Sequence, residues 1–230
     1  MMGDISQIAL TASVWVIPVL IAVTLHEAAH GWAAWKLGDD TAKILGRVSF
    51  NPFRHVDRFG TIILPAMLLF MRSPFLFGWA KPVPVNFRRL RDPRRGMVLV
   101  AAAGPGANFI LAYGSALLLH GAPFLPDDVA PWVVANLVNS IKLNVILAVF
   151  NMLPLPPLDG GRVAVGLLPG YLADPLARLE KYGLFILIGL IFLLPLVGRE
   201  FGYDVNVFSW VVGGPVAYLT EAIAMAAGIH

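Results

Sequence analysis

The sequence contains no cysteine, and only 13% of its 230 residues are charged. Without cysteine the chain can form neither a disulfide nor a cysteine-ligated zinc site, so any metal must be bound by histidine and carboxylate side chains. The scarcity of charge accompanies 58% hydrophobic residues and a mean hydropathy of +0.75. One water-soluble core of this length cannot bury so much apolar surface, so we expect a lipid bilayer to surround much of the protein.

The basic residues stand in short clusters between apolar segments, and the formal net charge is only +3. This arrangement differs from a basic face with interleaved aromatics and argues against nucleic acid as a partner. No lysine or arginine precedes the first apolar segment, so we expect no cleavable signal peptide and a mature protein that begins at or near Met1. No repeat, low-complexity tract or linker divides the chain, which predicts one membrane domain over residues 1–230.

Long apolar segments predict the membrane topology. A helix needs about 20 residues to cross a hydrocarbon core of roughly 30 Å. Four segments approach or exceed this length and a fifth, which contains Glu221, is a weaker candidate; they cover about residues 8–37, 97–119, 132–153, 182–197 and 207–227. The expected fold class is therefore an all-α polytopic membrane protein with four to five transmembrane helices.

Charges between these segments predict which side of the membrane each loop faces. Basic residues are favoured on the cytoplasmic side. They gather in three loops, as Lys36, Lys43, Arg47, Arg54 and Arg58, as Lys81, Arg88, Arg89, Arg91, Arg94 and Arg95, and as Arg162, Arg178 and Lys181. The first seven residues and the loop 121–131 carry only acidic charges, so we expect the N-terminus and this loop to lie outside.

The apolar segment 61–80 does not fit a simple crossing. It is interrupted by two prolines, an arginine and a glycine, and basic residues lie on both sides of it. Both ends should then be cytoplasmic, which predicts a re-entrant hairpin, or a short helix followed by an extended strand, between the first two core helices. Irregular backbone at this depth is tolerated only where protein or a water-filled cavity satisfies its polar groups. Two further prolines predict that residues 79–86 are extended.

The first apolar segment contains an HExxH motif, formed by His26, Glu27 and His30. On a helix the two histidines lie one turn apart on the same face and can bind one Zn²⁺, while Glu27 stands beside them as general base for the bound water. A chance match is the alternative. However, two histidines and a glutamate inside a membrane helix are costly, and such residues normally mark a functional site or an ion path.

A catalytic zinc needs a third protein ligand and an open position for water. Three other histidines are less suitable, because His55 falls in a basic loop, His120 at the opposite membrane face and His230 at the last residue. Asp159 is the best candidate, since three prolines break the chain just before it and two glycines after it allow close backbone approach. The alternative is an ordinary helix-to-loop turn in which Asp159 is an N-cap.

With these residues the sequence resembles the site-2 protease family of intramembrane zinc metalloproteases, in the compact form that lacks a PDZ domain. The residues that match its two signatures, HExxH and an Asn-x-x-Pro segment leading to Leu-Asp-Gly, are His26, Glu27, His30, Asn151, Pro154, Asp159 and Gly160. Residues 46–52, 78–86 and 103–108 also look like the compact members. The resemblance covers about residues 15–190.

The resemblance implies hydrolysis of a peptide bond in or near a transmembrane helix of a substrate protein, close to the cytoplasmic face of a bacterial or archaeal plasma membrane. It implies one Zn²⁺ per chain held by His26, His30 and Asp159, with Glu27 as general base. Asn151 is implied as a catalytic donor to the oxyanion, although its amide could instead satisfy backbone groups freed by Pro154. The implied partners are the lipid bilayer and a transmembrane substrate, with neither the substrate nor the oligomeric state specified.

Two other functions fit part of the sequence. A membrane metal or ion transporter also places histidines and acids inside the bilayer, and a proteolytically inactive regulator could share the fold. Glu27 distinguishes the first, because a transporter could work without it whereas hydrolysis requires a base. An inactive regulator would be expected to lose a motif residue, and none of them is missing here.

Overall fold

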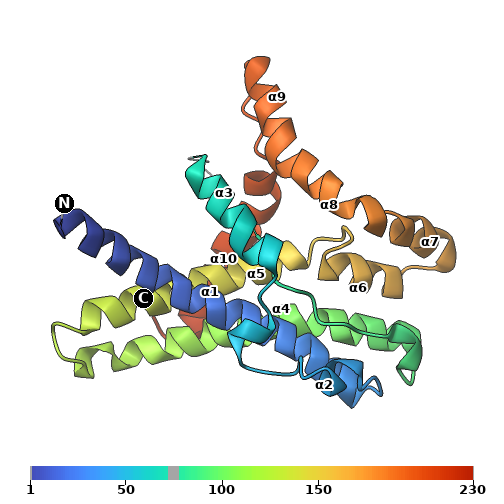
Figure 1. The fold of residues 1–230 in the computed structure, drawn as a ribbon, viewed down its shortest axis with the longest axis horizontal. Helices are drawn as coiled ribbons and strands as arrows, with labels where there is room; N and C mark the ends of the chain where they lie inside the picture. The colour runs from blue at the N-terminus through green and yellow to red at the C-terminus, as the bar shows by residue number, and fades with distance from the viewer. Residues whose placement is uncertain (1, 72–77, 230) are drawn as a thin grey trace.

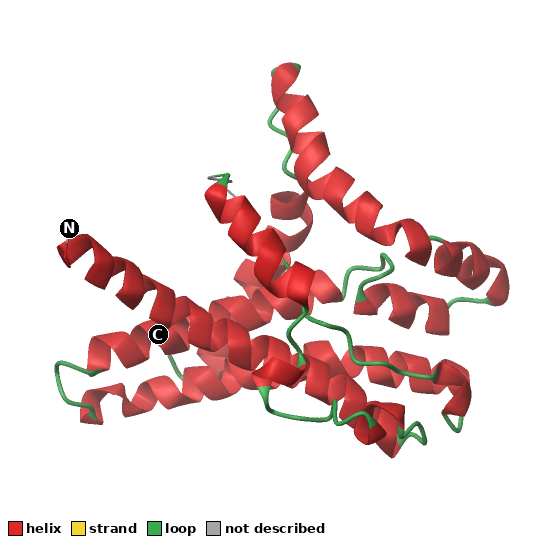
Figure 2. Ribbon diagram, in the orientation of Figure 1, coloured by secondary structure: helices red, strands yellow, loops and turns green. Residues whose placement is uncertain are grey.

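The computed structural model describes residues 2–71 and 78–229, and the regular secondary structure of this part of the chain is entirely helical (Figure 2). The longer helices are α1 (Met2–Lys36), α4 (Pro93–Leu118), α5 (Ala130–Asn151) and α10 (Gly214–Ala226). The shorter ones are α2 (Thr41–Ile44), α3 (Leu64–Phe70), α6 (Asp159–Leu167), α7 (Gly170–Arg178), α8 (Glu180–Ile188) and α9 (Leu194–Glu200). Helical turns of other types are η1 (Pro52–Arg54), η2 (Arg58–Ile63), η3 (Phe87–Arg89), η4 (Leu119–Phe124), η5 (Gly189–Leu193) and η6 (Ser209–Gly213).

Four helices in the described residues are long and apolar enough to cross a membrane. They are Leu10–Lys36, Pro93–Phe124, Ala130–Asn151 and Glu180–Glu200, the last formed by α8, η5 and α9 together. This confirms the predicted all-α polytopic fold and its first four spans. The fifth predicted segment forms η6 and α10, which pack against α5 but are not among these four helices.

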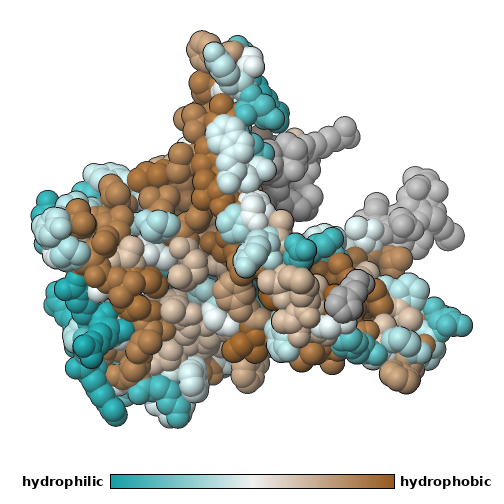
Figure 3. Space-filling model, turned by 180° about the vertical axis from the view of Figure 1, so that it is seen from behind, coloured by the Kyte–Doolittle hydropathy of each residue, from teal (hydrophilic) through white to brown (hydrophobic). Residues whose placement is uncertain are grey.

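Helices α1, α4 and α5 form the centre of the protein and lie side by side in Figure 1. Small side chains fill their interface: Ala22, Ala34, Ala112, Ala116 and Ala148 are all completely buried. Small residues let helix backbones approach closely in an apolar solvent, where packing drives association. Large apolar side chains face outward instead and cover much of the surface visible in Figure 3, as expected for a protein surrounded by lipid.

Helix α6 follows the proline-rich break after α5 and packs against α4. Arg94 of α4 holds the end of α6, because its Nε donates to the Gly166 carbonyl at 2.8 Å and its Nη2 donates to the Leu168 carbonyl. A cation at this end also complements the helix dipole. The start of α6, which carries Asp159, is thereby fixed relative to the central helices.

The predicted re-entrant segment begins as η2 and α3 and returns as an extended stretch over residues 78–86. Its two ends meet, since the Trp79 amide donates to the Gly60 carbonyl at 3.2 Å and the Thr61 hydroxyl donates to the Trp79 carbonyl at 2.8 Å. This closeness agrees with a hairpin. Residues 72–77, which fall within the predicted hairpin, lie outside the described residues. The returning stretch is extended but is not paired as a β-strand.

Two carboxylates hold the extended stretch against α1. Glu27 Oε2 accepts a hydrogen bond from the Val83 amide at 2.8 Å, and Asp39 Oδ2 accepts one from the Asn86 amide at 2.6 Å. Asp39 is completely buried and also binds the amide and hydroxyl of Thr41. Burial alone would raise the pKa of the Asp39 carboxyl, but these hydrogen bonds lower it below its ordinary value.

Candidate metal centre

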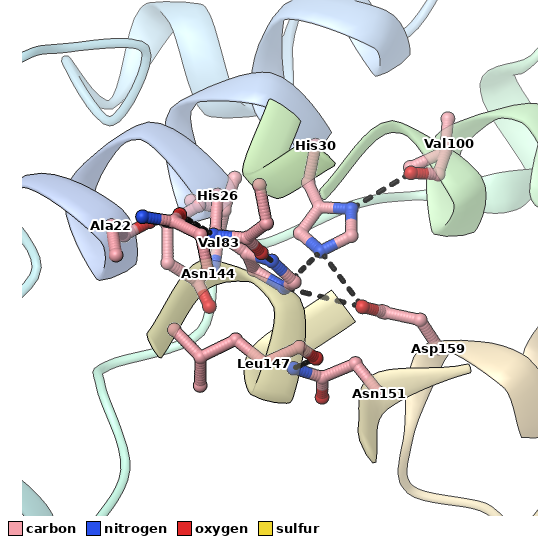
Figure 4. A network of polar contacts seen from close by, with 11 residues as sticks. Ala22, His26, His30, Val83, Val100, Asn144, Leu147, Asn151 and Asp159 are labelled. Carbon is pink, nitrogen blue, oxygen red and sulfur yellow. Dashed lines mark hydrogen bonds and ion pairs between the residues drawn. The ribbon is translucent and has the colours of Figure 1, made fainter. Parts of the chain in front are cut away.

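The two histidines of the HExxH motif meet Asp159 inside the protein (Figure 4). His26 and His30 come from α1, and Asp159 is the first residue of α6. Asp159 Oδ2 lies 3.2 Å from His26 Nε2 and 3.3 Å from His30 Nε2, while the two Nε2 atoms are 3.0 Å apart. His26 and Asp159 are each 8% exposed, so bulk water is largely excluded from the point where the three atoms meet.

The outer nitrogen of each imidazole is occupied. His30 Nδ1 lies 2.7 Å from the Val100 carbonyl oxygen, and His26 Nδ1 lies 2.6 Å from Asn108 Oδ1. A carbonyl oxygen can only accept, so His30 Nδ1 must carry the hydrogen and a neutral His30 presents the lone pair of Nε2 towards Asp159. Such an outer hydrogen bond is the usual way a protein orients a metal-binding histidine.

Asp159 contributes a negative charge to the same point. Its Oδ2 is buried and has no hydrogen-bond partner among the described residues, although both imidazole Nε2 atoms lie within 3.3 Å of it. Two nitrogen lone pairs and a carboxylate oxygen that face one another require a cation, and two histidines with one carboxylate are a typical zinc ligand set.

Close packing around the centre depends on two glycines. A Cβ on Gly104 of α4 would lie 2.6 Å from Cε1 of both imidazoles, and one on Gly160 of α6 would overlap the Met152 carbonyl. The prediction that glycine lets the backbone approach near Asp159 is therefore confirmed. Asp159 is not an N-cap, because Leu158 occupies that position and α6 has no side-chain cap.

The remaining histidines are engaged elsewhere. His55 Nε2 bonds the Ser49 carbonyl at 2.9 Å, and His120 Nε2 bonds the Ala227 carbonyl at 2.6 Å. His230 lies outside the described residues. Within residues 2–71 and 78–229, His26, His30 and Asp159 form the one group of at least three candidate metal ligands.

A cavity of about 360 Å³ opens beside the centre. Its polar lining residues are His26, Glu27 and Asn151, and the rest of its wall is mainly apolar. The Asn151 amide donates to the Leu147 carbonyl at 3.0 Å, one turn earlier on α5. Asn151 thus bonds the Leu147 carbonyl rather than a backbone group freed by Pro154, and it also lines the cavity.

Several contacts at the centre were not predicted from the sequence. The sequence predicted neither the bond between the Val83 amide and Glu27 nor the contact between His26 and Asn108. Asn108 in turn bonds Asn144 of α5. The available signal was the presence of two asparagines in apolar helices, since polar groups in a membrane interior require partners.

Together, the apolar spans and the buried His–His–Asp group define a polytopic membrane protein with a candidate metal centre on its first span. Residues 127–196 match the sequence model of Peptidase family M50. "Putative zinc metalloprotease YwhC" of Bacillus subtilis is 39% identical over 193 residues, which cover 79% of this chain and 80% of that protein. The chain therefore belongs to peptidase family M50, the site-2 protease family.

More distant relatives agree with this assignment. "Putative zinc metalloprotease Rip2" of Mycobacterium tuberculosis is 28% identical over 91% of this chain and 78% of its own length. The protein of the same name from Mycolicibacterium smegmatis is 25% identical over 88% of this chain and 75% of its own length. No solved structure matches the chain.

Proposed function

We propose that this protein is an intramembrane zinc metalloprotease that hydrolyses a peptide bond in or near a transmembrane helix of a substrate protein. The observation that carries the proposal is the meeting of His26, His30 and Asp159 at one point, with Glu27 on the wall of the adjoining cavity. Membership of a peptidase family and the zinc metalloprotease names of its relatives support hydrolysis as the reaction and zinc as the metal.

The three converging side chains fit one Zn²⁺ per chain. His26 and His30 would bind it through Nε2 and Asp159 through Oδ2, the atoms that face one another. Bound zinc supplies a Lewis acid that makes a water molecule more acidic and polarises a peptide carbonyl.

Glu27 serves as the general base in this proposal. Its Oε2 accepts the Val83 amide, and this bond fixes the carboxylate at the cavity wall. The carboxylate accepts a proton from the attacking water and returns it to the leaving amine. Asn151, which lines the same cavity, donates a hydrogen bond to the oxyanion that forms on the attacked carbonyl.

The shape of the site suits an extended apolar substrate. A second cavity of about 390 Å³ adjoins the first and shares Val23, Trp79, Ala80 and Leu147 with it. The backbone amides of Trp79 and Lys81 donate to the carbonyls of Gly60 and His55, respectively. Successive residues of an extended chain point to opposite sides, so the backbone groups of Ala80 point away from Gly60 and His55.

A substrate helix that unwinds locally could therefore pair with the segment 78–86 by strand addition. This step is tested with photocrosslinkers placed along 78–86 and on the outer faces of α1 and α5. Capture of substrate only from the helix faces would reject pairing with this segment.

The experiment that tests the function compares wild type with Glu27→Gln. The variant should retain wild-type zinc content, because all three ligands survive, and should lose cleavage, because the proton acceptor is gone. Asp159→Ala is the matched comparison, since it should lose zinc as well as cleavage. A proteomic comparison of membranes from cells carrying each form identifies accumulating substrates. Cleavage by Glu27→Gln would reject the protease, and metal transport by that variant would favour a transporter.

A further inference from the structure

Hydrogen bonds link His26 to two buried asparagines on two other helices, Asn108 and then Asn144 (Figure 4). His26 Nδ1 on α1 lies 2.6 Å from Asn108 Oδ1 on α4. Asn108 Nδ2 donates in turn to Asn144 Oδ1 on α5 at 2.7 Å. Both asparagines are completely buried, so water does not compete for these bonds.

A main-chain carbonyl determines which way the amide groups of the two asparagines point. Asn144 Nδ2 donates to the Ser140 carbonyl at 2.9 Å, and because that oxygen can only accept, the Asn144 amide is held with Oδ1 towards Asn108. Asn108 must then turn its NH₂ group towards Asn144, a choice reinforced by the Ala22 carbonyl at 3.4 Å. Its Oδ1 consequently faces His26.

The orientation of the Asn108 amide determines the tautomer of His26. Asn108 Oδ1 can only accept, so His26 Nδ1 must be the N–H and, in the neutral ring, Nε2 carries the lone pair that faces Asp159. His30 obtains the same orientation from the Val100 main-chain carbonyl, which no side-chain substitution removes. His26 differs from His30 because its orientation depends on two side chains from two other helices.

We propose that Asn108 and Asn144 are positioning residues that hold His26 in the tautomer and ring orientation required for metal binding. The inference rests on the proposed function only in requiring that the centre binds a metal. Loss of the acceptor at Nδ1 leaves the ring free to rotate and to place its hydrogen on Nε2. Removal of such outer partners typically weakens metal binding about 10- to 100-fold.

An alternative is that the two asparagines only stabilise helix packing. The two explanations predict different metal-binding results in the purified full-length protein in detergent. Zinc affinity is measured by competition with a chelator, and the visible spectrum of the Co²⁺ form reports the geometry of the ligands. The thermal unfolding of each metal-free variant is recorded separately, so that a packing defect is visible without metal.

Asn108→Ala should bind zinc about 10- to 100-fold more weakly and alter the Co²⁺ spectrum. Asn108→Asp keeps an oxygen acceptor at Nδ1 but loses the NH₂ group that donates to Asn144, so it should bind zinc more tightly than Asn108→Ala and less tightly than wild type. Asn139→Ala is the matched control, because Asn139 lies on α5 like Asn144 but outside this chain of bonds. Its amide donates to the Val14 carbonyl of α1 at 2.9 Å. The control should leave both the affinity and the spectrum unchanged.

Asn144→Ala provides a second test that does not depend on Asn108 variants folding. As a single substitution it should weaken zinc binding. Combined with Asn108→Ala it should cause no further loss of affinity, because the two residues act through one imidazole. Wild-type affinity in both single variants, or effects that match Asn139→Ala, would overturn the inference while leaving the metal centre intact. Absence of zinc binding in wild type would instead reject the proposed function.

Discussion

Replacing Gly104 by alanine tests the packing of the metal centre most directly. The new Cβ would lie 2.6 Å from Cε1 of both His26 and His30, whereas ordinary van der Waals contact begins at 3.4 Å. The imidazoles cannot easily yield, because each is held at Nδ1 by Asn108 or Val100. Either the rings or helix α4 must therefore move.

The size of the effect follows from two opposing contributions. Alanine in place of glycine inside a helix should stabilise it by about 0.5–1 kcal/mol, whereas an overpacked site costs about 1–3 kcal/mol. The net change in the free energy of unfolding then lies between zero and a loss of about 2.5 kcal/mol. Metal binding is more sensitive, since ligand distances tolerate only about 0.2 Å and the overlap with each Cε1 is about 0.8 Å. We expect zinc affinity to fall about 10- to 100-fold.

Gly106→Ala and Gly114→Ala are matched controls on the same helix, because a Cβ at either position meets no atom within 4 Å. Both should bind zinc normally and unfold at a slightly higher temperature. The assay is chelator competition on the three purified variants, with thermal unfolding before and after metal removal. Normal zinc affinity in Gly104→Ala would show that the two imidazoles do not pack against α4 as described.

Asn151→Ala should keep its zinc and cleave about 100-fold more slowly, a loss of roughly 3 kcal/mol in kcat rather than in substrate affinity, measured by steady-state kinetics. The lowered pKa of Asp39 stabilises the fold at neutral pH, and this stabilisation is lost as the pH falls through the native pKa. Asp39→Asn should therefore have a lower free energy of unfolding than wild type at pH 7, and this free energy should fall less on acidification than that of wild type. Urea titrations at several pH values measure both effects. Cysteines at the exposed positions Arg54 and Arg91 should be labelled only from the cytoplasm and one at Asp128 only from outside. Labelling of the first two from opposite sides would contradict the hairpin.

Hydropathy and length predicted the spanning helices because both properties are local. The differences lie at the ends, where the second span was expected at about 97–119 and the helix runs over Pro93–Phe124. Asp92 accounts for the earlier start, since its side chain accepts the Arg95 amide and caps the first turn of α4. Hydropathy marks the part of a helix that suits lipid, whereas backbone hydrogen bonds continue into the polar region.

The centre was predictable to the extent that its residues are close in sequence or have unusual neighbours. His26 and His30 follow from helical periodicity, and Asp159 from the prolines and glycines around it. The support for His26 was not predictable, because Asn108 is 82 residues away and its amide direction depends on a third helix. The Val83 amide belongs to the backbone, and no side-chain pattern indicates that it bonds Glu27.

Helix α6 carries Asp159 at its start and is held near its end by Arg94 of α4. A metal bound to Asp159 would therefore also hold the start of α6 in place. A metal shared by His30 and Asp159 would cross-link segments about 130 residues apart and close a long loop, much as a disulfide does. Chelation should then loosen α6 and α7 before it disturbs the packing of α1, α4 and α5. Hydrogen exchange would show this as early deuterium uptake over residues 159–178, so that loss of metal is also loss of local order.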